Sequence, residues 1–521
     1  MTRPVEVQAS PKSPARWWVL AILCLSLFMV VVDNTIVNVA LPTLSAELGA
    51  TTSNLQWIVD AYTLVFSALL LAFGYFGDRN GRRLALQAGL VIFAITSGLA
   101  ALSQTTAQLI GARALMGIGA ALIFPATLAI IISVFTDVKE RAVAIGIWSG
   151  VTGLAVAAGP VTGGLLLEHF GWGSIFLVNM PIAAVALVAG RLVVPDSRDP
   201  KPGRLDRLGL MLSVTAVAGV IWAVIEAPHR GWTSPEVVVT GTLGLLLLVG
   251  FVLYERRIAN PLLDVTLFAN PRFSAASIAI ASAFFGLFGF IFLITQYMQL
   301  VLGYSPLAAG VRTVPFAVVT GLFSPASIAI MHRVGTKAVV ATGLFLMSAG
   351  FVVASTLSAD SAYFGPVLLA MVIMAAGLGL TTSPATEAIM GALPPARAGV
   401  GSAVNDTTRE LGGTLGVAIV GSVFASLYGP KVVDGLAGFP AEVVAVVEES
   451  MGAAVVISGQ IPNGAMLLEA AQSAFMSGFA AGSLVAAAAT AIGGVLAVLW
   501  LPARHAATAP LETVKADVAA V

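Results

Sequence analysis

The chain has 521 residues, of which 58% are hydrophobic and only 10% are charged, whereas about a quarter of the residues of a soluble domain are charged. Such a chain has too little polar surface for a soluble globular protein, and its 53 glycines suit closely packed membrane helices. The formal net charge of zero argues against nucleic acid as a partner, and the single cysteine, Cys24, excludes an internal disulfide and a thiolate metal cluster.

Apolar segments near the length that spans a bilayer, about 20 residues, recur along the whole chain. They predict an all-α membrane protein with fourteen transmembrane helices, at residues 17–40, 54–76, 84–103, 107–132, 142–166, 172–193, 208–226, 236–254, 273–299, 306–330, 338–358, 363–388, 398–428 and 471–501. If both termini are cytoplasmic, only Arg230 and Lys431 among the basic residues outside the helices fall on the other side. This bias predicts a multi-pass plasma-membrane protein with both termini cytoplasmic.

A weak internal repeat divides the predicted helices into two halves. The segment 78–83 has a degraded echo at 332–337, and Pro-Ala-Thr at 125–127 recurs at 384–386. Both copies face the same side of the membrane, so the repeats are parallel. We expect two six-helix bundles with helices seven and eight inserted between them. The expected parts are a cytoplasmic tail (1–16), an N-terminal bundle (17–193), linkers with the extra pair (194–272), a C-terminal bundle (273–501) with an extracellular loop at about 429–470, and a second cytoplasmic tail (502–521).

The long extracellular segment contains an amphipathic stretch from Val443 to Val456. This stretch suits a helix on the membrane surface. An ordered loop without a function explains it equally well, because long loops are translocated with little constraint. No role follows from the sequence.

The loop after the second predicted helix has the chemistry of a cytoplasmic latch. Glycines permit a tight turn and close helix contact, and an acid beside arginines can exchange ionic partners at helix ends. Fixing the topology is the simpler role for the arginines, but the spacing and the position favour a latch. The residues are Gly74, Gly77, Asp78, Arg79, Gly81, Arg82 and Arg83.

Five of the charged residues inside predicted helices need a reason to be there, because a charged side chain near the bilayer centre costs at least ~2.5–3.5 kcal/mol, and function is the default hypothesis. Asp33 and Arg113 fall at similar depth and can pair or share a cavity, so that protonation of the acid can report the conformation. Asp406, Arg409 and Glu410 share a face of the thirteenth helix, as a structural ion pair or as a second proton site. Three acids near helix ends are expected to be solvated caps, namely Asp60, Glu226 and Glu387.

The fifth predicted helix is rich in glycine and contains a Gly-Pro step. Small residues let helices approach closely, and proline removes a helix hydrogen bond and allows a bend. A pliable, tightly packed helix suits a seal between the two halves, although generic packing is the simpler explanation of its glycines. The residues are Gly146, Gly150, Gly159, Pro160, Gly163 and Gly164.

In order along the chain, these motifs resemble those of the major facilitator superfamily, whose signature loop reads Gly-x-x-x-Asp-Arg-x-Gly-Arg-Arg. Three stretches resemble more closely the fourteen-helix drug:proton antiporters of the EmrB/QacA type. They are the first-helix run Val32 to Pro42, the run Arg113 to Ala120, and the antiporter-type glycine motif of helix 5, in which Ala155 replaces one glycine. After helix 5 the family commonly has Trp-Arg-Trp, whereas this chain has Trp172-Gly173-Ser174, so a role for that arginine is not carried over.

The resemblance implies a major facilitator fold that exports hydrophobic or amphiphilic small molecules, such as drugs or antibiotics, in exchange for protons by alternating access. In the family the arginine that corresponds to Arg113 is implicated in proton coupling. Proton symport and export of an endogenous metabolite are the alternatives. The implied partners are a small-molecule substrate, protons and the lipid bilayer, and we expect a monomer.

Other classes of protein fit less well. A membrane enzyme would need clustered catalytic groups, and the sequence has no metal-ligand spacing, nucleophile elbow or nucleotide-binding loop. A sensor or scaffold would need a soluble signalling domain, and none is evident. We therefore expect a transporter without a cofactor or metal.

Overall fold

A computed structural model of the chain describes residues 15–198, 206–259, 261–393 and 398–502. Within these ranges the chain is helical and contains no strand. Fourteen of its helical segments are long and apolar enough to cross a membrane. This confirms the predicted all-α fold with fourteen spans. Residues 1–14 and 503–521 of the two predicted tails lie outside the described residues.

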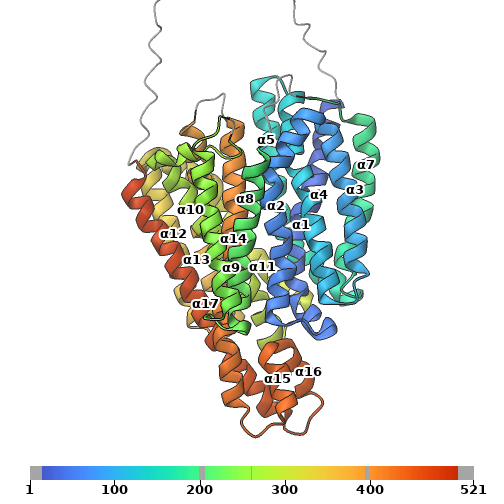
Figure 1. Cartoon of the computed structure of the whole chain (residues 1–521), viewed down its shortest axis with the longest axis vertical. Coiled ribbons are helices and arrows are strands. Elements are labelled where there is room, and N and C mark those ends of the chain that lie inside the picture. The colour runs from blue at the N-terminus through green and yellow to red at the C-terminus, as the bar shows by residue number, and fades with distance from the viewer. Residues whose placement is uncertain (1–14, 199–205, 260, 394–397, 503–521) are drawn as a thin grey trace, which may run out of the picture.

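Six spans form the N-terminal bundle, coloured blue to turquoise in Figure 1. Polar N-caps begin several of its helices, because the side chains of Thr51, Thr105 and Asp137 accept backbone N–H bonds in the first turn. The helices are α1 (Ala15–Leu48), α2 (Thr52–Asn80), α3 (Arg82–Ala101), α4 (Thr106–Val134), α5 (Val138–His169) and, together as the sixth span, α6 (Ser174–Leu177) and α7 (Asn179–Val193).

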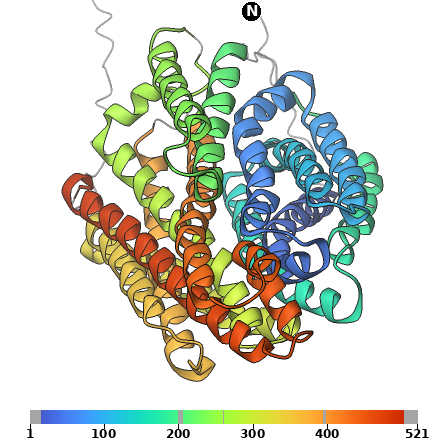
Figure 2. The ribbon, with the colours of Figure 1, turned by 60° about the horizontal axis from the view of Figure 1, so that its bottom comes forward.

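The C-terminal bundle lies beside the first, as Figure 2 shows. Proline in the first turn, after a capping Asn270 or Ser305, begins two of its helices. After η1 (Val265–Ala269), the spans are α10 (Pro271–Gln296) with η2 (Tyr297–Val301), α11 (Pro306–Val334), α12 (Thr336–Ser355), η3 (Tyr363–Val367) with α13 (Leu368–Gly391), α14 (Ala398–Gly435) and α17 (Gly464–Trp500).

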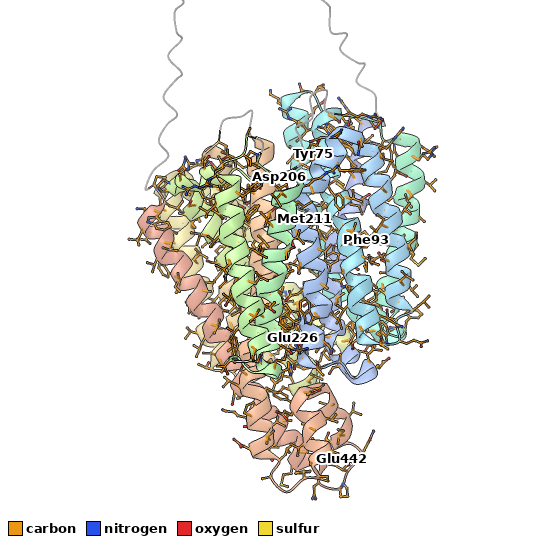
Figure 3. All side chains as sticks on the ribbon, in the orientation of Figure 1. Tyr75, Phe93, Asp206, Met211, Glu226 and Glu442 are labelled. Carbon is orange, nitrogen blue, oxygen red and sulfur yellow. The ribbon has the colours of Figure 1, made fainter. Side chains whose placement is uncertain are left out.

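The remaining two spans, α8 (Arg207–Arg230) and α9 (Pro235–Glu255), form the predicted extra pair between the bundles. α8 packs against α2 of the first bundle and α14 of the second. Glu226 fixes this position: it accepts hydrogen bonds from Ser53 Oγ (3.2 Å) and Trp57 Nε1 (3.1 Å) of α2 and pairs with Arg230 at 2.9 Å. The expectation of a solvated cap is therefore wrong for Glu226, which Figure 3 labels.

The two membrane faces differ in what they carry. α1 begins and α17 ends at one face, here called the termini face, at the top of Figure 1. The opposite face, here called the cap face, carries α15 (Ala441–Glu449) and α16 (Met451–Ser458), here called the cap. In Figure 3, Tyr75 and Asp206 lie toward the termini face and Glu442 lies in the cap.

The segment predicted as a long loop contains the two cap helices, and α14 and α17 extend beyond their predicted ends to reach them. The cap rests on the turn between α1 and α2 instead of lying apart from the helices. Ser450 Oγ is 2.6 Å from Ser45 Oγ, and Thr52 Oγ1 donates to the carbonyl of Glu449 at 3.3 Å. A segment of the C-terminal bundle thus contacts the N-terminal bundle at the cap face.

Candidate functional site

Asp33 of α1 and Arg113 of α4 meet inside the N-terminal bundle. Arg113 Nη1 lies 2.5 Å from Asp33 Oδ2, and both side chains are fully buried. Asn179, the first residue of α7, donates to Asp33 Oδ1 at 2.8 Å and to Ser97 Oγ of α3 at 3.4 Å. Four helices thus hold one buried ion pair, and the two residues predicted at similar depth are direct partners. Asn179 has no motif of its own and became visible only through this contact.

Arg113 also contacts α2. Its Nε donates to the carbonyl of Ile58 at 3.1 Å, and its guanidinium lies 4.2 Å from the centre of the Tyr62 ring. Tyr62 in turn donates its hydroxyl to the carbonyl of Val30 at 3.3 Å. In the described part of the chain, Arg113 Nη2 has no hydrogen-bond partner. Because a buried charge is costly unless it is paired, these contacts are what allow an arginine at this depth.

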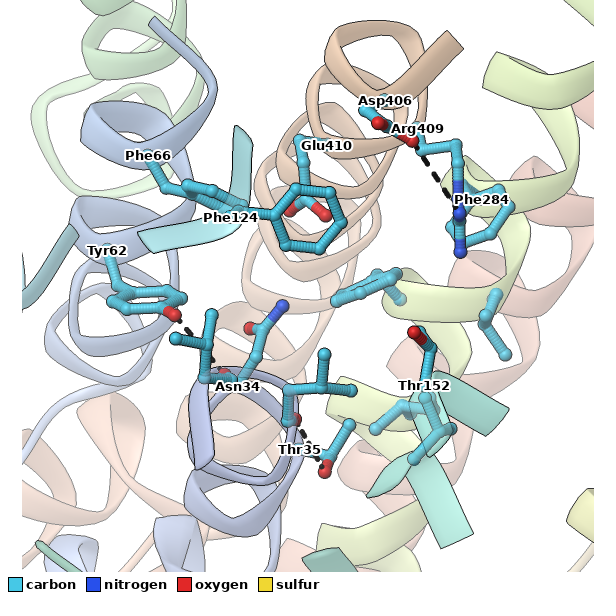
Figure 4. A pocket seen from close by; sticks show the side chains of 16 residues that line it. Asn34, Thr35, Tyr62, Phe66, Phe124, Thr152, Phe284, Asp406, Arg409 and Glu410 are labelled. Atoms are coloured by element: carbon cyan, nitrogen blue, oxygen red, sulfur yellow. Dashed lines mark hydrogen bonds and ion pairs between the residues drawn. The ribbon is translucent and has the colours of Figure 1, made fainter. Parts of the chain in front are cut away.

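A cavity of about 700 Å³, counted with its open mouth, lies between the two bundles. Aromatic side chains from both bundles form much of its wall, namely Phe66, Phe124, Phe284 and Phe288 (Figure 4). Tyr62 belongs to the same wall, whereas Asp33 and Arg113 are not among the described residues that line the cavity. The ring of Tyr62 is therefore shared between the cavity and the buried ion pair.

The three charged residues predicted on the thirteenth helix all reach this cavity from α14 (Figure 4). Arg409 lies over the Phe284 ring at 4.5 Å and is 3.9 Å from Asp406, a long ion pair of half-buried groups. Asp406 also accepts a bond from Asn405 at 3.4 Å. Glu410 differs from them, because its buried Oε2 has no hydrogen-bond partner among the described residues. Glu410 is thus the carboxylate left available to a molecule in the cavity.

Asp60 corrects a second expectation, since it is fully buried instead of solvated. Neither of its carboxylate oxygens has a hydrogen-bond partner within the residues that the structure describes. Its helical neighbours face α14: Gln56 Nε2 donates to the carbonyl of Ala418 at 2.9 Å, and Thr414 Oγ1 donates to Thr63 Oγ1 at 3.0 Å. Asp60 thus lies on the face of α2 that meets the C-terminal bundle. Apolar sequence on both sides was the signal for its burial.

The glycines of helix 5 divide into two groups. Near the cap face, Gly159 and Gly163 pack against Thr35 and Ile36 of α1, and a Cβ on either would overlap these residues. The second group, Gly146 and Gly150 in the half nearer the termini face, faces open space, where an added Cβ would meet nothing within 4 Å.

The backbones of α5 and α11 approach each other closely where these helices of the two bundles cross near the cap face. A Cβ on Gly164 would overlap Pro306 and Leu307, and one on Gly310 would overlap the carbonyl of Pro160. Gln299 Nε2 adds a bond to the carbonyl of Val39 in α1 at 2.9 Å. Toward the termini face, Gly321 of α11 has open space. The cavity is thus closed toward the cap face.

We expect Gly310→Val to prevent closure at the cap face, because the added side chain meets the α5 backbone and not a movable side chain tip. Spin labels on cysteines introduced at 169 and 305 would then lie farther apart than in the otherwise unchanged protein. Transport, measured separately, would be lost. The native Cys24 is buried, so the labels are selective. Gly150→Val is the matched control and leaves this distance unchanged; the same distance in both variants would contradict the seal.

Most of the latch residues, which were predicted to form a loop, lie in helices. α2 continues to Asn80 and α3 begins at Arg82, so only Gly81, with φ of 124°, separates them. α2 ends after, and α3 begins before, the apolar segment from which each was predicted, because both helices continue into polar residues. Asp78 pairs with Arg82 at 2.8 Å, and Arg83 donates to the carbonyl of Val194 at 3.3 Å. In this conformation the contacts found for these side chains in the described residues lie within the N-terminal bundle or at Val194, directly after it.

Two of the latch glycines, Gly74 and Gly77, leave room for a Cβ at ordinary van der Waals distance. A Cβ on Gly77 would lie 3.4 Å from Ala85, and one on Gly74 would lie 3.7 Å from Pro125. Arg79 Nη1 donates to the hydroxyl of Tyr75 at 3.0 Å.

We expect Asp78→Asn to slow transport without weakening substrate binding, because the pair with Arg82 lies outside the cavity lining. The pair is exposed enough that its loss costs about 0.5 kcal/mol or less. Turnover in vesicles and equilibrium binding should be measured together. Glu236→Gln breaks another exposed ion pair, with Arg230, and serves as the control. Weakened binding at normal turnover would refute a latch.

Comparison with known proteins agrees with this architecture. Residues 23–417 match the family described as Major Facilitator Superfamily. The chain is 38% identical to the multidrug efflux pump LfrA of Mycolicibacterium smegmatis, over 94% of this chain and 97% of that protein. It is 35% identical to the methyl viologen resistance protein SmvA of Salmonella typhimurium, over 88% and 93% of the two chains.

Among solved structures, a bacterial homologue of the human lysosomal transporter Spinster in an inward-facing, unoccupied conformation matches with a TM-score of 0.65 and 19% identity. The match covers 94% of this chain and 99% of that one. At this identity the likeness shows the fold alone. Two parallel bundles, the extent of the family match and the closely related full-length sequences lead to one conclusion: this chain belongs to the major facilitator superfamily, a family of membrane transporters and not of enzymes.

Proposed function

We propose that this protein exports hydrophobic or amphiphilic small molecules, drugs or antibiotics among them, in exchange for protons by alternating access. The observation that carries the proposal is an aromatic cavity between two bundles, with an unpaired carboxylate, beside a fully buried acid–arginine pair. A cavity closed toward one face is one of the two states that alternating access requires. Relatives named for multidrug efflux and methyl viologen resistance support outward transport.

The same cavity suits an aromatic cation. Phenylalanine rings offer apolar surface and a negative face to a cation, and Glu410 offers a carboxylate without a partner in the described structure. The working unit is proposed to be a monomer, because both bundles that enclose the cavity belong to the same polypeptide.

The termini face is proposed to be cytoplasmic in the plasma membrane. Arg79, Arg82 and Arg83 at this face exemplify the excess of basic residues in cytoplasmic segments. The substrate would then enter the cavity from the cytoplasm and leave past the cap face once α5 and α11 separate. In this scheme the bundles at 17–193 and 273–501 rock against each other, with Gly159, Gly163 and Gly164 of helix 5 in the seal and the Gly74–Arg83 segment as the cytoplasmic latch.

Proton coupling is assigned to two groups of residues. Asp33 carries the proton, and Arg113 pairs with it whenever it is ionised, so the buried pair alternates between a closed ion pair and a protonated acid. On α14, Glu410 is proposed as a second titrating group that faces the substrate, with Asp406 and Arg409 setting the charge around it. In both sites, whether the carboxyl group is protonated depends on which charged partners lie beside it in each conformation.

Reconstituted vesicles test the proposal with ethidium, a fluorescent aromatic cation whose permanent charge prevents it from following a pH gradient by itself. With the membrane potential clamped, antiport predicts that ethidium accumulates in vesicles with an acidic lumen and not in vesicles with an acidic exterior. Vesicles without protein provide the control. Accumulation with an acidic exterior would instead establish symport. Lack of ethidium movement in either gradient, together with gradient-driven movement of a cell metabolite, would favour export of an endogenous compound.

A further inference from the structure

Among the described residues that line the cavity, Tyr62 alone has a ring, hydrogen-bond or ionic interaction with the guanidinium of Arg113. The ring is fully buried and is held by its hydroxyl bond to the carbonyl of Val30. Glu410 of α14 lines the same cavity as Tyr62. One aromatic side chain of α2 therefore lies between the two groups of ionisable residues.

We propose that Tyr62 is a positioning residue that couples the cavity to the Asp33–Arg113 pair: a cation bound against the ring loosens its hold on Arg113 and thereby drives the proton from Asp33. The proposal rests on the proposed exchange of substrate for protons. It adds the residue through which one site senses the other.

The physical basis is that one ring has a limited capacity to attract cations. When Asp33 carries a proton, Arg113 loses its ionic partner and keeps the carbonyl of Ile58 and the face of Tyr62. A ring face attracts a desolvated cation. The ring is closed to water in this conformation, so a cationic substrate must part the wall slightly to contact it. The substrate then competes for this attraction and also repels Arg113. The ionised form of Asp33 then becomes the favoured partner of Arg113, and the proton leaves.

The other polar and charged groups around the Asp33–Arg113 pair each lack an interaction with Arg113 or a place in the cavity wall. Asn179 of α7 and Ser97 of α3 hold Asp33 but carry no charge and do not line the cavity. Glu410 of α14 lines the cavity but has no hydrogen bond or ion pair with Arg113 in the described structure. Asp60 shares the face of α2 that meets α14 and is not among the described residues that line the cavity. Tyr62 alone provides direct contact with both sites.

The coupling predicts how ethidium binding depends on pH. Substrate and proton exclude each other, so the wild-type Kd for ethidium should fall as the pH rises, by up to about tenfold per pH unit for one proton. Tyr62→Phe keeps the ring and should keep this dependence. Trifluorophenylalanine in place of Tyr62 keeps the shape but weakens the cation–ring attraction. With Glu410→Gln present in every variant compared, so that this second carboxylate does not titrate, it should flatten the dependence to about twofold or less per pH unit, while ethidium still binds.

Two controls and two contrary outcomes complete the experiment, which uses the full chain in lipid nanodiscs. Phe66→Leu removes a neighbouring wall ring that is not found over Arg113, so it should weaken ethidium binding but keep the pH dependence. Tyr428→Phe removes another buried tyrosine hydroxyl, bonded to Val447 in the cap region, and controls for loss of that group. An unchanged pH dependence with the fluorinated ring would overturn the role of Tyr62. No pH dependence in the wild type would instead refute the proposed proton exchange itself.

Discussion

Asp33→Asn is expected to abolish proton-driven export, because the amide preserves the shape of the side chain but cannot titrate. The structure adds a cost that the sequence alone does not give. Arg113 stays charged and fully buried after the change, and removal of one partner of such a pair costs about 3–5 kcal/mol. The variant should therefore insert but unfold at a lower temperature, and both unfolding and ethidium transport need to be measured.

The double variant Asp33→Asn with Arg113→Gln separates structure from coupling. It removes both charges, so stability should return toward that of the wild type while proton-driven transport stays absent. The single variant Arg113→Lys keeps the charge but loses the planar guanidinium that bonds both Asp33 and the carbonyl of Ile58. Its transport should therefore be lower than that of the wild type but not absent. Glu226→Gln breaks an ion pair away from the cavity and should retain transport. A stable double variant that still transports would make the pair purely structural.

Much of the fold was predictable because the bilayer imposes a length on each apolar segment. The same signal fails at helix ends, since it measures membrane thickness and not helix length. α2 continues four residues past its predicted end at 76, through Asp78 and Arg79 to Asn80. The cap helices were hidden for the same reason: α15 and α16 do not span a membrane, and their contact with the α1–α2 turn joins Ser45 to Ser450, far apart in sequence.

The site was predictable to the extent that charge inside a membrane demands a reason. This rule found Asp33 and Arg113, and similar depth on neighbouring helices made their contact foreseeable. The rule could not find Asn179 and Tyr62, because they are uncharged. Their contacts with Asp33 and Arg113 depend on how α7 and α2 pack. Asp60 escaped it because depth was judged from a predicted helix end, whereas the packing of α2 against α14 determines its burial.

Glu410→Gln is expected to weaken binding of ethidium by about tenfold or more, a loss of ~1.4 kcal/mol. Two opposite charges ~4 Å apart attract by ~4 kcal/mol at an effective dielectric constant of ~20, so a tenfold loss remains after water in the cavity screens most of the attraction. A neutral aromatic compound of similar size should bind nearly as before, because the aromatic wall is unchanged.

The matched control for this charge is the neighbouring pair on α14. Asp406→Asn alone would leave Arg409 as an excess positive charge beside the cavity and would also weaken a cation, so Asp406→Asn is combined with Arg409→Gln. Because the two charges compensate each other, this double variant should alter ethidium binding by about threefold or less, and their half-buried positions limit the loss of stability to about 1 kcal/mol. If Glu410→Gln weakened the neutral compound as much as ethidium, Glu410 would shape the cavity without acting through its charge. Asp33 would then be the principal proton site, and the aromatic rings would account for substrate binding.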